Sequence, residues 1–453
     1  MNNILEVKNL EISYISEGKN TNAVKSVSFV LEKGETLGII GESGSGKTSL
    51  AMAIMGLINS PSNVSGKILY QGVDLQSLTE KEKNKYRWDK ISIVFQNNLE
   101  VLNPVLTLYE QIIEGIKRHS DLEDTAMKNK VIDLMKLVDL DPKWAHHYPH
   151  QLSGGMRQKV LIAMALACDP DLLIVDEPTT SLDPISANGI LQLLINIQNT
   201  RTFSMIIISH ELSILSKLSD RLLVMYDGHI LEEGITSEII KEPYHTYTRG
   251  LINSSIEIFP FHDLWGIPAE DSNLIKNGDG CPFYYRCNQR ITDCKIIKPN
   301  ILNLSDNRKI ACIRGGIVTL LEGINISKSY IMHNKPLKAC INCNIKVRSG
   351  EIVVLMGQSG SGKTTLASIL SGILESDEGD IYFEGTKLLK NSETSKLNGI
   401  QMVFQDPFSA TDSYMTVEEV IKQPLDIIKE GNSLFRKDKV KEALGFVQLE
   451  SSE

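Results

Sequence analysis

The stretch GESGSGKT at residues 41–48 decides the fold. It follows an apolar segment, TLGII at 36–40, and precedes a segment with helical periodicity, SLAMAIMGLI at 49–58. Glycines between a strand and a helix allow backbone N–H groups and the helix dipole to surround a phosphate. The sequence therefore predicts an α/β fold in which this strand–loop–helix unit binds the phosphates of a nucleotide.

Each polar residue of this loop has an expected role. Lys47 would reach the β- and γ-phosphates, and the Thr48 hydroxyl would bind magnesium. A glycine-rich turn that binds nothing is the alternative. The candidate nucleotide ligands are Gly41, Ser43, Gly44, Ser45, Gly46, Lys47, Thr48 and Ser49.

The same stretch occurs twice. GQSGSGKT at 357–364 repeats the first loop, and Lys363 lies 316 residues after Lys47. Tyr14 and Tyr330 share this offset, so one unit is duplicated. We expect EIVVLM at 351–356 to form the strand before the second loop, and the candidate ligands there are Gly357, Gly360, Gly362, Lys363, Thr364 and Thr365.

Composition excludes several classes of protein. The 453 residues are 42% hydrophobic and 23% charged, as in soluble globular chains, and the net charge of -9 argues against nucleic acid as the main partner. The amino terminus lacks the pattern of a secretory signal, and the apolar runs are too short to span a bilayer. We expect a cytosolic protein whose contact with the membrane is peripheral.

A pair of carboxylates ends another apolar segment. LLIV at 172–175 is followed by Asp176 and Glu177, and ligands of parallel sheets bind at this end of a strand. Asp176 is suited to magnesium binding, and Glu177 to deprotonating the attacking water. A solvated pair of acids is the alternative.

A third motif is QLSGGMRQ at 151–158. Ser153 can cap a helix, and Gly154 and Gly155 allow close backbone approach, so this is a second candidate anion site. With these motifs in this order, the chain resembles the ABC ATPase superfamily, whose signature is similar to LSGGM and whose Walker B strand is similar to LLIVDEPT. The resemblance implies a RecA-like core with antiparallel β and helical subdomains, present here in repeat.

The resemblance also implies roles for single residues. Tyr14 and Tyr330 would stack on adenine, although Tyr14 taken alone is better explained as a core residue. Gln96 and Gln405 would be the Q-loop glutamines, with Gln96 also near magnesium. Asp183 resembles the D-loop aspartate, and His210 the switch histidine.

In this family two nucleotide-binding domains enclose two ATP molecules, so Ser153 and Gly155 would contact the nucleotide of an opposing domain. The second copy reaches Glu453 without a signature, a Walker B strand or a switch histidine. We therefore expect hydrolysis to require a second nucleotide-binding domain from another chain or from a continued reading frame.

Four of the seven cysteines are close together in the sequence. Cys281, Cys287, Cys294 and Cys312 lack the paired C-x2-C spacing of structural zinc sites, so a 4Fe-4S cluster is the first choice, and zinc or packed free thiols remain open. EPYHTYTRGLINS at 242–254 and the cysteines after it resemble the carboxy-terminal extension of oligopeptide and dipeptide importer ATPases. Cys340 and Cys343 align with Val24 and Val27, which indicates core packing instead of a metal site.

These observations predict three domains: a complete ABC domain at 1–250, an extension with four cysteines at 251–315, and the front part of a second ABC domain at 316–453. The predicted function is the ATPase of a peptide importer at the cytoplasmic face of the membrane, with permease subunits as partners and a solute-binding protein as an indirect one. A nickel or other small-solute importer is the near alternative. A tandem ABC protein acting on the ribosome and a degenerate regulatory protein belong to other classes.

Overall fold

The computed structural model describes residues 3–16, 19–96, 101–255, 258, 267, 280–332, 335–388, 399–406, 411–412 and 414–449. The chain divides into two compact units, Met1–Ile317 and Val318–Glu453. Each is described by itself. None of the helices in the described ranges combines the length and the apolar composition that a bilayer span needs.

A mixed sheet forms the centre of the first unit. Its strand order is β11-β12-β10-β9-β3-β8-β7-β6, and β9, β3, β8, β7 and β6 pair in parallel. The apolar runs of the parallel strands are buried on both faces, as is usual for such sheets. The strands are β3 (Thr36–Ile40), β6 (Ile91–Val94), β7 (Leu172–Asp176), β8 (Ser204–Ser209), β9 (Arg221–Tyr226), β10 (His229–Ile235), β11 (Ile301–Ser305) and β12 (Arg308–Ala311).

An antiparallel sheet forms a second layer. Its strand order is β2-β1-β4-β5. One face packs on a hydrophobic core that it shares with the central sheet, through residues such as Leu5, Leu10 and Phe29. The other face carries polar side chains, as expected for alternating strands. The strands are β1 (Asn3–Ser16), β2 (Lys19–Glu32), β4 (Ser62–Tyr70) and β5 (Val73–Asp74).

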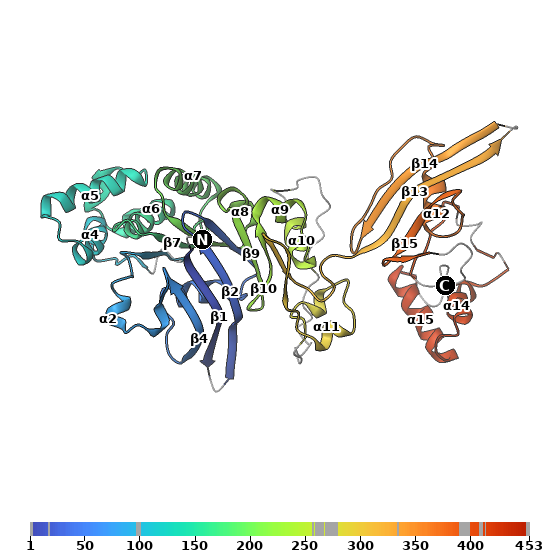
Figure 1. The fold of residues 1–453 in the computed structure, drawn as a ribbon, viewed down its shortest axis with the longest axis horizontal. Helices are drawn as coiled ribbons and strands as arrows, with labels where there is room; N and C mark the ends of the chain where they lie inside the picture. Colours follow the sequence, from blue (N-terminus) through green and yellow to red (C-terminus); the bar gives the residue numbers. More distant parts are fainter. Residues whose placement is uncertain are drawn as a thin grey trace. The chain divides into compact units, whose positions relative to one another are not determined.

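Helices complete the first unit. Figure 1 shows α4, α5 and α6 gathered at one end of it, and α10 and α11 at the other. The α-helices are α1 (Lys47–Ile54), α2 (Glu80–Lys83), α4 (Leu108–His119), α5 (Asp124–Leu137), α6 (Gly154–Ala165), α7 (Pro184–Thr200), α8 (Leu212–Leu218), α9 (Thr236–Lys241), α10 (Thr246–Asn253) and α11 (Asp293–Ile296). Short 3₁₀ helices lie at Leu75–Ser77, Pro142–His146, Pro149–Gln151 and Tyr284–Arg286. The α/β core with an antiparallel sheet and a helical subdomain is thus confirmed.

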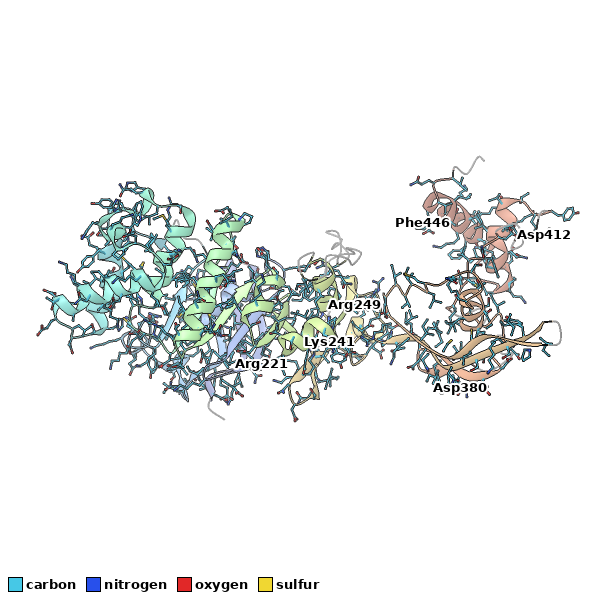
Figure 2. The ribbon with its side chains drawn as sticks, turned by 90° about the horizontal axis from the view of Figure 1, so that it is seen from above. Arg221, Lys241, Arg249, Asp380, Asp412 and Phe446 are labelled. Carbon is cyan, nitrogen blue, oxygen red and sulfur yellow. The ribbon has the colours of Figure 1, made fainter. Side chains whose placement is uncertain are left out.

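The extension continues the central sheet of the first unit. β12 pairs with β10, and a buried ion pair between Arg308 and Glu232 at 2.6 Å joins the two strands. Arg221, labelled in Figure 2, lies at the start of β9. It forms ion pairs with Glu35 at 2.7 Å and with Glu233 at 2.5 Å. Charged groups buried in this way are normally paired, since an isolated one is costly to desolvate.

The second unit repeats the antiparallel sheet and the helix after the loop. Its sheet has the order β14-β13-β15-β16, and Ile326, Cys340, Leu366, Ile369 and Leu370 form a small core beneath it. Core packing is thereby confirmed for Cys340. The elements are β13 (Thr319–Met332), β14 (Lys335–Arg348), α12 (Lys363–Leu370), β15 (Glu378–Phe383), β16 (Thr386–Lys387), α14 (Val417–Ile427) and α15 (Ser433–Phe446).

The prediction of a strand at residues 351–356 was wrong. These residues have no regular secondary structure, and Ile352, Val354 and Met356 are exposed. In the first unit the equivalent strand, β3, pairs on both sides with β8 and β9. The described part of the second unit contains no counterparts of β8 and β9, so an apolar run alone does not make this strand.

Candidate functional site

The first phosphate-binding loop, residues 41–48, runs from β3 to α1 and closes around the Lys47 side chain. Lys47 Nζ donates to the carbonyl oxygens of Gly41 at 2.8 Å and Glu42 at 2.9 Å. Gly46 has φ of +97°, and a Cβ there would lie 2.2 Å from the Ala23 carbonyl oxygen, so only glycine fits. Gly44, Ser45, Thr48 and Ser49 continue the same turn into the helix.

Lys47 is buried, and burial lowers its pKa. The carboxylates of Glu177, Asp176 and Glu42 partly offset this effect. The ammonium group therefore interacts electrostatically with the carboxylates at the end of β7. This arrangement gives a site in which one cation faces several acids, as expected where phosphate and metal are both bound.

The three residues predicted to be catalytic meet at the carboxyl ends of neighbouring parallel strands. Glu177 and His210 directly follow β7 and β8, and Gln96 lies just beyond β6. Glu177 Oε2 accepts from Gln96 Nε2 at 2.7 Å, and Glu177 Oε1 lies 3.2 Å from His210 Nδ1. The structure thus brings Gln96, Glu177 and His210 into one cluster.

One member of this cluster was missed from the sequence. The Thr180 hydroxyl donates to Glu177 Oε2 at 2.8 Å. The signal was present in EPTTSLDP, because a hydroxyl three residues after a strand-end acid can turn back to it. Glu177 itself has φ of +45°, a conformation that a residue with a side chain rarely adopts and that often occurs at functional sites.

The surroundings of the Asp176 carboxylate suit a bound cation. It is 2% exposed, and burial raises its pKa to about 6, while a hydrogen bond from Thr48 acts in the opposite direction. Among the residues that the structure describes, its Oδ1 has no hydrogen-bond partner. A buried carboxylate oxygen in that state, beside a threonine hydroxyl, suits a magnesium ion and its water ligands.

Tyr14 lies on β1 close to the start of α1. Its hydroxyl bonds to Ser49 Oγ at 3.1 Å, and its ring packs against the inner core. Both explanations offered by the sequence, a core residue and a platform for adenine, agree with this position.

The signature residues lie around the amino-terminal ends of α6 and α7. Ser153 caps α6 by accepting from Met156 N at 3.3 Å, and Asp183 caps α7 by accepting from the N–H groups of Ile185 and Ser186. A Cβ on Gly155 would lie 3.1 Å from Ser186, so the two caps adjoin. Within the described part of the chain, Ser153, Gly154 and Gly155 contact residues of this region, such as Met156, Leu182 and Ser186, and not residues 41–48.

Comparison with known proteins places this geometry in a family. The family model described as ABC transporter matches residues 24–180 and 340–452. The chain belongs to the ABC transporter family. The model described as oligopeptide/dipeptide transporter, C-terminal region, matches residues 231–294 of this ABC protein.

Several curated relatives are similar over long stretches. The dipeptide transport ATP-binding protein DppD of Bacillus subtilis is 40% identical over 69% of this chain and 95% of its own length. The oligopeptide transport ATP-binding protein OppD of Mycobacterium tuberculosis is 31% identical over 94% of this chain and 76% of its own. The glutathione import ATP-binding protein GsiA of Salmonella typhimurium is 34% identical over 94% of this chain and 67% of its own length. The chain is therefore an ATPase of the transport type, with ATP as its nucleotide and magnesium as its metal.

The second phosphate-binding loop of this ABC ATPase, residues 357–364, keeps the local geometry of the first. Lys363 Nζ donates to the carbonyl oxygens of Gly357 at 2.8 Å and Gln358 at 2.7 Å. Gly360 and Gly362 have φ of +81° and +91°. Thr364 and Thr365 lie in the first turn of α12, whereas Tyr330 and Gln405 are exposed. The loop forms without the strand before it.

The iron–sulfur prediction for the extension is not supported. Cys281, Cys287, Cys294 and Cys312 are free thiols, and in the described ranges no group of three or more His, Cys, Asp or Glu residues is arranged to hold a metal ion. Burial raises the pKa of Cys281 to about 12, and the other three cysteines add to this effect. The described residues therefore give no support to a 4Fe-4S cluster in this segment.

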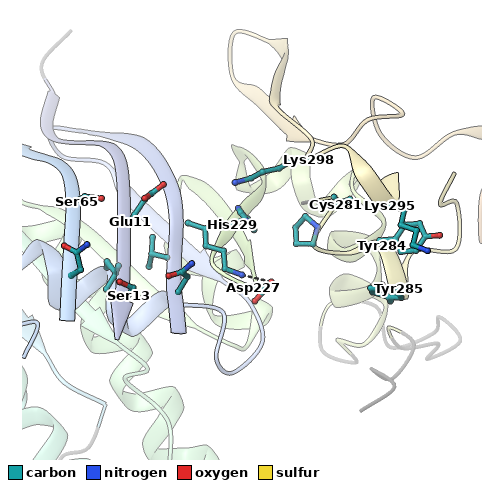
Figure 3. Close-up of a pocket in the computed structure, with 17 residues that line it drawn as sticks. Glu11, Ser13, Ser65, Asp227, His229, Cys281, Tyr284, Tyr285, Lys295 and Lys298 are labelled. Carbon is teal, nitrogen blue, oxygen red and sulfur yellow. Dashed lines mark hydrogen bonds and ion pairs between the residues drawn. The ribbon is translucent and has the colours of Figure 1, made fainter. Parts of the chain in front are cut away.

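A pocket of about 620 Å³ lies between the antiparallel sheet and the cysteine segment (Figure 3). Glu11 and Ser13 line it from β1, and Tyr284 and Tyr285 line it from the extension. An ion pair between Lys25 and Asp227 at 2.8 Å crosses its wall. Residues 41–48 do not line this pocket, so it is distinct from the nucleotide site.

Proposed function

We propose that this ABC ATPase energises the import of peptides. It would do so at the cytoplasmic face of the membrane by binding permease subunits, which receive peptide from a solute-binding protein. Support comes from the match of residues 231–294 to the peptide-transporter region and from relatives named for dipeptide, oligopeptide and glutathione transport. Their names favour a peptide over nickel or another small solute.

The observation that carries the catalytic part of the proposal is the cluster of Gln96, Glu177 and His210 beside Lys47. Glu177 is the only one of these with a carboxylate, and it is held by Gln96 and Thr180 in one orientation. It would accept a proton from the attacking water, and His210 would donate to a phosphate oxygen. Tyr14 would stack on the base.

Lys47 and the loop around it would hold the nucleotide phosphates. The ligands proposed for magnesium are the Thr48 hydroxyl, Gln96 and, through water, Asp176. When bound, magnesium would neutralise charge on the β- and γ-phosphates. Lys363 would contribute in the same way to a nucleotide at the second loop.

Ser153, Gly155 and Asp183 would act on a nucleotide held by an opposing domain. Ser153 and Asp183 cap the amino-terminal ends of α6 and α7, and the amino-terminal end of a helix suits an anion such as a phosphate delivered by a partner. A second nucleotide-binding domain is therefore part of the proposal.

An iron–sulfur cluster bound by the four cysteines is not part of the proposed function. Absorbance near 400 nm, together with iron and acid-labile sulfide analysis of anaerobically purified protein, would test that separate hypothesis.

The test of the proposed function replaces Glu177 with glutamine in the assembled transporter. Glu177→Gln should retain MgATP binding, trap the nucleotide and lower hydrolysis by roughly 10²- to 10⁴-fold, the usual contribution of a general base. Glu211→Gln is the matched control, because Glu211 is an exposed acid next to the same histidine.

Transport assays then separate the substrates. Vesicles with the permease and binding protein should accumulate a labelled dipeptide when ATP is supplied, and Glu177→Gln should abolish this. Accumulation of nickel without peptide would refute peptide import, and unchanged hydrolysis in Glu177→Gln would refute the catalytic assignment.

A further inference from the structure

The first phosphate-binding loop is tied to the cysteine segment by a forked ion pair. Arg286 Nη1 and Nη2 lie 2.8 Å and 2.9 Å from Glu42 Oε2 and Oε1, respectively. Glu42 lies inside the loop, and Arg286 lies one residue before Cys287. Bidentate contacts of this kind fix orientation as well as distance.

The arginine is itself held firmly. Its guanidinium lies 5.6 Å from the centre of the Tyr226 ring and 5.9 Å from that of Phe283. Tyr247 packs against both of these rings and is fully buried. A cation seated on packed aromatic rings has little freedom, so it can act as a fixed point for Glu42.

Tyr247 contacts the same residue of the loop. Its hydroxyl oxygen accepts from the Glu42 N–H at 3.0 Å. The carbonyl oxygen of Glu42 accepts from Lys47 Nζ. The side chain, the N–H and the carbonyl of Glu42 thus each have a partner, and two of these partners come from residues far along the chain.

The second loop provides an internal comparison. Gln358 stands where the first loop has Glu42, and yet Lys363 makes the same bonds to two carbonyl oxygens. The loop can therefore adopt this geometry without a carboxylate at this position, so a contact made through Glu42 would affect how firmly the geometry is held and not whether it forms. In the first loop the carboxylate serves the contact with Arg286.

We propose that Arg286 and Tyr247 are positioning residues for the first phosphate-binding loop. They hold Glu42, and through it the carbonyl that orients Lys47, so that these two residues set the affinity of this loop for MgATP. The inference rests on nucleotide binding at the first loop, which belongs to the proposed function.

The test measures MgATP affinity by calorimetry on the full chain. Every variant is made in a parent chain that carries Glu177→Gln, which prevents hydrolysis, and Lys363→Met, which removes the lysine of the second loop. Arg286→Met and Glu42→Gln should each raise the Kd about tenfold, equal to about 1.4 kcal/mol. The double variant should be no weaker than either single one, because both remove one interaction.

Two further variants separate positioning from general damage. Arg290→Met is the matched control, since Arg290 lies in the same segment, stacks on Tyr284 and leaves Glu42 untouched. Its affinity should be unchanged. Tyr247→Phe should weaken binding because it removes the acceptor of the Glu42 N–H. In the assembled transporter, Arg286→Met should raise KM and leave kcat within about twofold.

Strictly additive effects of Arg286→Met and Glu42→Gln would overturn the inference. So would unchanged affinity in both, or an equal loss in Arg290→Met. If Arg286→Met does not fold, Glu42→Gln and Tyr247→Phe decide, since glutamine already occupies the equivalent position of the second loop. A parent chain that bound no MgATP would instead remove the proposed function.

Discussion

Replacing Arg308 with methionine should strongly destabilise the first unit. The Glu232 carboxylate is fully buried, and it accepts from Arg308 Nη2 at 2.6 Å, Tyr244 N at 2.8 Å and His245 N at 3.1 Å. Arg308→Met would leave this charge with two backbone donors and no counter-ion. Removing one partner of a buried pair costs about 3–5 kcal/mol, and the two remaining donors place the expected loss at about 3 kcal/mol.

The double variant should lose less stability than Arg308→Met alone. Glu232→Gln with Arg308→Met removes both charges, so the expected loss is about 1–2 kcal/mol, mainly from polar groups left unsatisfied. The Lys309→Met control should cost less than about 1 kcal/mol, because Lys309 is partly exposed and Glu233 keeps its ion pair with Arg221.

Urea unfolding followed by tryptophan fluorescence is the appropriate assay. The three tryptophans, at positions 88, 144 and 265, all belong to the first unit, so the signal reports on that unit. A loss for Arg308→Met below about 1 kcal/mol, or a double variant less stable than Arg308→Met, would refute the reasoning.

Three other predictions follow. Burial lowers the pKa of His245 to about 3, so below pH 6.5 the unfolded chain binds a proton at this residue and the folded chain does not. The free energy of unfolding should therefore fall by about 2 kcal/mol between pH 7 and pH 5. His245→Asn keeps a capping acceptor for α10 and should make the free energy of unfolding less dependent on pH. Thr180→Val should lower ATPase turnover about tenfold without changing MgATP affinity, because it frees the Glu177 carboxylate, and steady-state kinetics would show this. Hydrogen exchange should be fast at 351–356 and slow at the equivalent residues 36–40, and equal protection would contradict the observed structure.

The sequence predicted most of the geometry of the candidate nucleotide site because the signals for it are local. A glycine-rich loop between an apolar strand and a helix specifies its own conformation, and an acid at a strand end is placed by the sheet. The meeting of Gln96, Glu177 and His210 follows once their strands are neighbours. Thr180 was within reach of the same reasoning and was overlooked.

Other features depended on contacts between distant parts of the chain. The run at 351–356 has the composition of a buried strand, but its conformation depends on neighbours that composition does not reveal. The four cysteines have a suggestive spacing, whereas burial and backbone path decide whether thiols converge. The contact of Arg286 with Glu42 joins residues 244 positions apart, and no periodicity or motif indicated it.

The pairing of β12 with β10 determines where this protein can be divided. A shortened chain that stopped at residue 250 would expose the backbone donors and acceptors of β10 and would bury Glu232 without its counter-ion. Such a fragment would be prone to edge-to-edge association. A cut following residue 317 keeps the strand and the ion pair together, and so it is the boundary to choose when the first ATPase unit is prepared in isolation.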